Sequence, residues 1–162
     1  MKIKVGAVLF FILVASAVSF STDQETLDQL IARANAAQPG QQPDLFLEVA
    51  DREVKFAIES YKANKPEDGS AALQQVVNYA DKAHSLVLQS GKKLPHTEIK
   101  IRRMSRSLRD LKQNVEADDQ SGVQAAVDKL ESFRSELLKA MFGAKKPIEN
   151  PPAEKPQEKQ KQ

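Results

Sequence analysis

A basic segment near the middle of the chain has the residue types needed to bind an anion. The stretch GKKLPHTEIKIRRMSRSLRDLK, residues 91–112, contains eight lysines and arginines and only two acidic residues, Glu98 and Asp110. Planar guanidinium groups bind phosphate or carboxylate through paired hydrogen bonds. The segment is therefore a candidate docking surface, and the alternative is a solvated helix face with intramolecular ion pairs. Its four arginines are Arg102, Arg103, Arg106 and Arg109.

The two histidines could bind a metal or a haem, but the sequence supplies few further ligands. His84 follows Asp81 in an Asp-x-x-His pattern that occurs once, whereas a di-iron bundle needs Glu-x-x-His twice. Met104 could be a second haem ligand, although His84 also fits a position at the edge of a core. His96 follows Pro95 and fits an exposed first helical turn. We expect no metal site and no cofactor.

Motifs of the common enzyme classes are missing from the sequence. It has no G-x-S-x-G, no glycine-rich phosphate loop, no H-E-x-x-H and no cysteine. The acidic residues are spread along the predicted helices, and none stands out as part of an acid–base pair. The sequence therefore favours a non-enzymatic protein that acts by binding a protein or a ligand. A cofactor-binding helical bundle or an enzyme is a less favoured alternative.

Ala, Leu, Gln, Glu, Lys and Arg fill most of the chain, and all of them favour the α-helix. The candidate site residues are therefore expected on helices. Prolines and glycines mark the boundaries: QPGQQP ends the first helix, NKPEDGS forms a turn before the third, and ADDQSG separates the last two. The predicted helices span residues 23–37, 43–63, the segment that follows NKPEDGS up to Ser90, 95–116 and 122–142.

The fourth predicted helix carries an apolar seam and an arginine stripe on opposite sides. At about 100° per residue, the four arginines fall opposite the seam and face solvent or a partner. The acidic side of the molecule is predicted in the second helix and the turn after it, at Glu48, Asp51, Glu53, Glu59, Glu67 and Asp68. The seam consists of Ile101, Met104, Leu108, Leu111 and Val115.

The first two predicted helices belong together. Thr22 and Glu25 have the T-x-x-E spacing of a capping box that would start the first helix. The second helix has a main apolar face and a second one formed by Leu45, Val49 and Phe56. Large exposed apolar stripes are rare, so we expect the first helix to cover that second face.

Short connections make consecutive helices antiparallel. The expected fold is all-α: an up-down-up-down four-helix bundle, residues 22–143, with a short extra N-terminal helix. Residues 43–90, with KANKPEDGSAALQQVVNYADKA, resemble a tetratricopeptide-type helical hairpin, and this resemblance implies stacked helical hairpins as the alternative. The chain after its leader also resembles small all-helical proteins that bacteria export, which implies a compartment and no particular activity.

Both ends of the chain differ from the helical part. Residues 1–19 are predicted as a signal peptide because the chain starts with its three-part order: a basic start, MKIK, then an apolar run, VGAVLFFILV, then a segment of small residues, ASAVSFS. An uncleaved anchor is the alternative, but the apolar run of residues 5–20 is shorter than the roughly 20 residues of a membrane span. Residues 144–162 contain four of the eight prolines and almost no apolar residues, which predicts a disordered tail.

The charge balance and the leader bound the choice of partner. The chain has 24 basic and 22 acidic residues, and two of the basic ones, Lys2 and Lys4, lie in the predicted leader. The mature chain without the leader is therefore formally neutral. Nucleic acid is disfavoured because no aromatic residues interleave the arginines. We expect a periplasmic or extracellular protein, not integral to the membrane once the leader is cleaved, that binds a protein or an anionic envelope component. The alternative is a regulator or chaperone-like protein docked on the membrane surface; the oligomeric state is open.

Export is the first testable prediction. When the chain is produced in a bacterium with its leader intact, the small residues before Val18 and Phe20 should direct cleavage there. Intact-mass analysis of the exported protein should give a chain that starts at one of these two residues. Recovery of the full-length chain from the cytosol would contradict the prediction.

Overall fold

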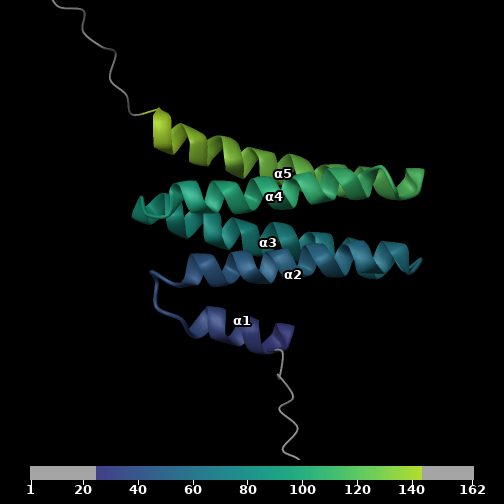
Figure 1. Ribbon diagram of the computed structural model, residues 1–162, viewed down its shortest axis with the longest axis horizontal. Coiled ribbons are helices and arrows are strands. Elements are labelled where there is room, and N and C mark those ends of the chain that lie inside the picture. Colours follow the sequence, from purple (N-terminus) through teal and green to yellow (C-terminus); the bar gives the residue numbers. More distant parts are fainter. Residues whose placement is uncertain (1–24, 144–162) are drawn as a thin grey trace, which may run out of the picture.

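A computed structural model of the protein describes residues 25–143, and all regular structure in this range is helical. The predicted signal peptide, residues 1–19, and the predicted tail, residues 144–162, lie outside the described residues. The predicted all-α class is confirmed (Figure 1). The helices in the described range are α1 (Leu27–Ala36), α2 (Gln42–Lys62), α3 (Pro66–Ser90), α4 (Leu94–Lys112) and α5 (Ala117–Phe142).

The four long helices form two hairpins that pack on each other. α2 packs against α3, and α4 packs against α5. Between the hairpins, α3 packs against α5 and α2 against α4, whereas no Cα atom of α2 lies within 8 Å of one in α5. Helices joined by short turns run in opposite directions, so parallel helices meet where the hairpins touch (Figure 1). The bundle therefore has the stacked-hairpin order that the tetratricopeptide-type resemblance implies as the alternative.

Apolar side chains at helical spacing fill the space between the hairpins. The predicted seam of α4 is buried from Ile101 to Leu111, and Val115 is partly buried against it. On α5, Val123, Leu130 and Leu137 are fully buried. Each large side chain removed from water contributes roughly 1.5–3 kcal/mol, so this seam fixes which side of α4 faces inward.

Small residues let α2 and α3 approach closely. Ala50, Ala57 and Ala80 are fully buried between the helices of the bundle. At Gly69 a Cβ atom would lie 2.6 Å from Cε2 of Tyr61, so only glycine allows the tyrosine ring of α2 to rest on this turn of α3. Gly69 is thus explained by close helix packing and not by a turn.

Two predicted breaks are largely or wholly helical in the structure. The sequence predicts a turn at NKPEDGS and a break between helices at ADDQSG, but α3 begins at Pro66, so that only Asn64 and Lys65 of the first segment lie outside a helix, and α5 begins at Ala117. Proline is well suited to the first position of a helix, because its missing N–H would have no partner there. The acidic residues of these segments lie in the first turns, where carboxylates interact favourably with the helix dipole. They are Glu67 and Asp68 in α3, and Asp118 and Asp119 in α5.

α4 ends at Lys112, earlier than the predicted residue 116. The backbone N–H of Asn114 donates to the carbonyl of Leu111 at 2.8 Å, and its side-chain amide donates to the carbonyl of Asp110 at 2.7 Å. These bonds satisfy carbonyls at the end of the helix. Glu116 is extended, with φ −63° and ψ 157°, and serves as the N-cap residue of α5.

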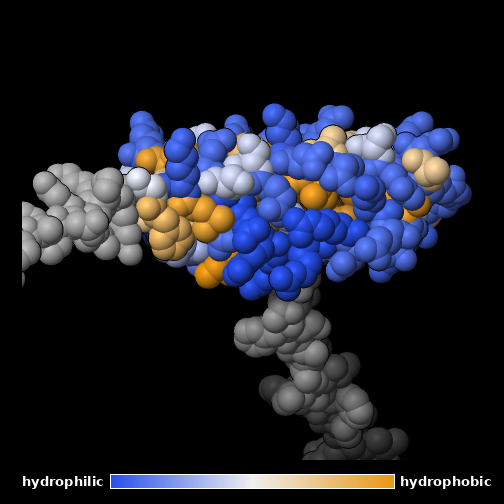
Figure 2. Space-filling view, turned by 90° about the horizontal axis from the view of Figure 1, so that it is seen from above, coloured by the Kyte–Doolittle hydropathy of each residue, from blue (hydrophilic) through white to orange (hydrophobic). Residues whose placement is uncertain are grey.

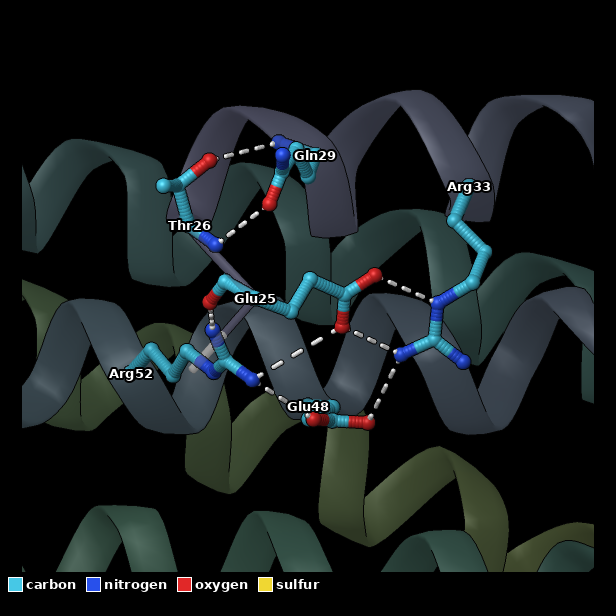
Figure 3. Close-up of polar contacts among 6 residues, drawn as sticks. All are labelled: Glu25, Thr26, Gln29, Arg33, Glu48 and Arg52. Atoms are coloured by element: carbon cyan, nitrogen blue, oxygen red, sulfur yellow. Dashed lines mark hydrogen bonds and ion pairs between the residues drawn. The ribbon is translucent and has the colours of Figure 1, made fainter. Parts of the chain in front are cut away.

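A different capping box from the predicted one starts α1. Thr26 is the N-cap: Gln29 N donates to its Oγ1 at 3.2 Å, and Thr26 N donates to Gln29 Oε1 at 2.9 Å (Figure 3). The prediction that Glu25 completes a box with Thr22 is therefore wrong, because Glu25 precedes the helix. The spacing of Thr22 and Glu25 fits the capping-box motif, but the carboxylate of Glu25 binds charged arginine side chains instead.

Glu25 connects α1 to α2 through two arginines. Arg33 donates to both carboxylate oxygens of Glu25, at 2.8 and 2.7 Å, and Arg52 of α2 donates to the backbone carbonyl of Glu25 at 2.5 Å (Figure 3). The hydrogen bond from Arg33 holds the pKa of Glu25 below its usual value.

α1 covers the second apolar face of α2 at Val49, which is fully buried, but leaves Phe56 49% exposed. The predicted cover is therefore correct only for the first half of α2.

Glycine substitutions test where α5 begins. Gly122 lies inside α5, and a Cβ atom at this position would meet open space, so Gly122→Ala should stabilise the protein by about 0.5–1 kcal/mol through helix propensity. Gly91 has φ +66°, so Gly91→Ala should destabilise it by about 1 kcal/mol. Urea unfolding followed by circular dichroism measures both. A neutral or destabilising Gly122→Ala would indicate that ADDQSG is a break after all.

Candidate anion-binding surface on α4

Helix α4 is anchored at its start by residues of the basic segment itself. Lys93, the N-cap residue, donates through Nζ to the carbonyl of Gly40 at 2.7 Å and to Asp44 Oδ2 at 2.5 Å. His96 Nε2 lies 3.5 Å from the other oxygen of Asp44. These contacts tie the start of α4 to the start of α2. Lys93 is thus used within the molecule and is not part of a docking surface.

The four predicted arginines are all exposed on the outer side of α4, opposite its buried seam. In Figure 2 the most hydrophilic residues gather in one continuous area of the face formed by the upper helices of Figure 1. The structure divides these arginines into two pairs with different surroundings. Arg102 and Arg109 face carboxylates, whereas Arg103 and Arg106 face none in the range 25–143.

The first pair belongs to an ion-pair network between α4 and α5. Arg109 Nη2 donates to Glu131 Oε1 at 2.5 Å, and Arg102 Nε lies 3.7 Å from Glu98 Oε1. Arg134 of α5 joins the two carboxylates: it donates to Glu98 at 2.7 Å and to Glu131 at 3.2 Å. The alternative interpretation, a helix face with intramolecular ion pairs, therefore holds for Arg102 and Arg109.

Glu98 and Glu131 are the carboxylates at the centre of this network. The side chain of Glu98 is only 9% exposed, so its charge depends on Arg134 for compensation. Burial alone would raise the pKa of Glu131, but hydrogen bonds from Ser105 and Arg134 hold it below its usual value. Hydrogen bonds to Glu98 and Glu131 raise the pKa of Arg134. Glu131 and Arg134 are therefore both charged at neutral pH.

The sequence did not predict this network. The acidic side of the protein was expected in the second helix and its turn, yet the carboxylates that meet the arginine stripe lie in α4 and α5. Of the predicted acidic residues, Glu48 pairs with Arg33 and Arg52, and Asp51 pairs with Lys55 of its own helix. The sequence feature that could have indicated the network is the i, i+3 spacing of Glu131 and Arg134, which places both on one side of α5.

The second pair, Arg103 and Arg106, has no such partner. Both side chains are exposed, and neither makes a hydrogen bond or an ion pair with any residue of the range 25–143. They lie three residues apart, so they project from the same side of α4. We call Arg103 and Arg106 the free arginine pair. Two unpaired guanidinium groups on one side of a rigid helix can bind a phosphate or carboxylate group between them or one group each.

Neither histidine forms a metal site with the residues that the structure describes. His84 is buried, stacks on Phe133 of α5 with ring centroids 4.8 Å apart, and has Nε2 3.3 Å from Glu136 Oε2. This matches the predicted position at the edge of a core. Met104 is buried in the seam. Over residues 25–143, no three His, Asp or Glu side chains lie together as a metal-binding group.

Comparison of the chain with models of known protein families, with curated proteins and with solved structures gives no significant match. None of the helices in the described part is both long and apolar enough to cross a bilayer.

Paired and unpaired arginines should respond differently to substitution. Arg134→Met leaves the buried carboxylate of Glu98 without its closest partner, so the free energy of unfolding should fall by about 1–3 kcal/mol. Arg103→Met makes the same chemical change at an exposed site outside the network and should alter it by about 0.5 kcal/mol or less. Urea unfolding at neutral pH compares the two variants. Equal losses would show that the network does not hold α4 on α5.

Proposed function

We propose that the protein is an exported, non-enzymatic binding protein that docks an anionic partner through the free arginine pair. The observation that supports this proposal is the contrast within one stripe of four arginines. Glu98 and Glu131 neutralise Arg102 and Arg109, while no residue of the described range takes up the charge or the hydrogen-bond donors of Arg103 and Arg106.

The network also makes the free arginine pair a rigid feature. α4 is fixed by its buried seam, by Lys93 at its start and by Arg134 along its length. Binding therefore orders less of this protein's backbone than it would if the two arginines lay on a flexible loop. Arginine suits this role because its donors are arranged in a planar fork that matches phosphate and carboxylate oxygens.

A mature chain with equal numbers of acidic and basic residues has little attraction for an anion as a whole. Attraction must then come from local charge, and it acts over roughly the Debye length of about 10 Å at moderate salt. The helix that bears the free arginine pair contains six of the basic residues and two of the acidic ones. The proposed partner is accordingly an anionic component of the cell envelope, which the protein meets after export.

A phosphate-bearing matrix tests the charge argument without knowledge of the natural partner. The mature chain is applied to phosphocellulose at low ionic strength and eluted with a salt gradient. The variant R103Q/R106Q should elute at distinctly lower salt than the wild type, because glutamine keeps helix propensity nearly constant while it removes the charge.

The matched control is K65Q/K129Q, which removes two exposed positive charges that lie away from the outer side of α4. It has the same net charge as R103Q/R106Q, so it should elute later than that variant if location matters. Coincident elution of the two double variants would contradict the proposal, because retention would then report net charge alone. Circular dichroism checks that both variants remain folded.

A further inference from the structure

We propose that the anionic partner is a lipid bilayer surface, with Ile99 and Phe142 entering its interfacial region while the free arginine pair contacts lipid phosphates. This inference rests on the function proposed above and adds the class of partner. Its basis is a second surface feature, the exposed apolar side chains. Among the described residues the large apolar side chains that stay exposed are Phe56, Ile99 and Phe142, at 49%, 45% and 66%.

Ile99 lies on the same side of α4 as the free arginine pair. Residues 99, 103 and 106 follow the i, i+4, i+7 spacing that places side chains in one row along a helix. Ile99 is thus one turn before Arg103, toward the start of α4. An isoleucine in this row gains nothing from the core, which lies on the opposite side of the helix.

Phe142 ends α5 at the same end of the hairpin. The hydrogen bond between Glu98 and Arg134 sets the register of the antiparallel helices. Phe142 lies eight residues beyond Arg134, about 12 Å further along α5, which places it past the start of α4 at Leu94. It also follows Glu131 by eleven residues, which is three helical turns, so it lies on the side of α5 that borders α4.

Figure 2 shows an apolar area at the left end, where α5 ends in Figure 1, directly beside the most hydrophilic area. A surface that combines exposed Phe or Ile with arginines is suited to a bilayer interface, because the apolar side chains enter the headgroup boundary and the cations meet anionic lipids. An acidic protein surface would complement the arginines but would gain little from Phe142.

Vesicle binding tests the inference on the full mature chain. The probe is vesicles of phosphatidylglycerol and phosphatidylcholine at a ratio of about 1 to 2, compared with pure phosphatidylcholine. The wild type should co-sediment with the anionic vesicles and much less with the neutral ones. R103Q/R106Q should bind the anionic vesicles about 25-fold more weakly, at roughly fivefold for each arginine.

Apolar substitutions separate this inference from the proposed function. I99S/F142S should weaken binding to anionic vesicles about tenfold and leave elution from phosphocellulose unchanged. Phe56→Ser is the control, because it removes another exposed aromatic, from the side of α2 next to α1, and should change neither measurement. If I99S/F142S binds vesicles as the wild type does, the bilayer inference is wrong, and a partner recognised by charge alone, such as an acidic protein, remains.

A tryptophan probe keeps the test valid even if I99S/F142S unfolds. The chain has no tryptophan, so Phe142→Trp places a single indole at the proposed contact and Phe56→Trp places one elsewhere. Anionic vesicles should shift the emission of Phe142→Trp to shorter wavelength and leave that of Phe56→Trp unchanged. An unshifted Phe142→Trp, or equal shifts in both variants, would overturn the inference.

Discussion

The carboxylate of Glu98 is almost buried where α4 packs against α5, and a buried charge is tolerated only when it is paired and hydrogen-bonded. Arg134 meets this requirement from α5, and it also binds Glu131. Because one side chain satisfies two carboxylates on different helices, α4 and α5 can take only a narrow range of registers. The pairing of Arg109 follows from that register, since Glu131 lies on α5, whereas Arg102 lies near Glu98 one turn before it on α4 itself.

The same constraint decides which arginines remain available to a partner. Arg102 is paired with Glu98 of α4 and Arg109 with Glu131 of α5, while Arg103 and Arg106 form no ion pair with either carboxylate. α1 provides a useful comparison: Arg33 and Arg52 share Glu25 and Glu48, so every arginine of that cluster is paired. The free arginine pair is therefore an exception in a protein whose other arginines all have carboxylate partners within the described range.

The sequence predicted the features that depend on local spacing. Helix type, the seam of α4 and the outward side of its arginines all follow from a period of 3.6 residues, and the structure confirms them. Helix starts were predicted less well: PEDGS and ADDQSG combine acidic residues with glycine and serine, which suit both turns and first helical turns. Tertiary packing decides between these states, as the contact of Tyr61 with Gly69 shows.

Pairing between helices was beyond prediction for a different reason. Which carboxylate meets Arg109 depends on the relative shift of two helices by a single turn, and local pattern does not set that shift. The stacking of the hairpins has the same origin, because antiparallel neighbours are compatible both with a ring of four helices and with two stacked pairs. Buried alanines such as Ala50, Ala57 and Ala80 allow α2 and α3 a close approach, and α4 and α5 then pack as a second pair joined by charge. The candidate surface is thus a product of helix register: a shift of α5 by one turn would move Glu131 away from Arg109 and change which guanidinium groups face outward unpaired.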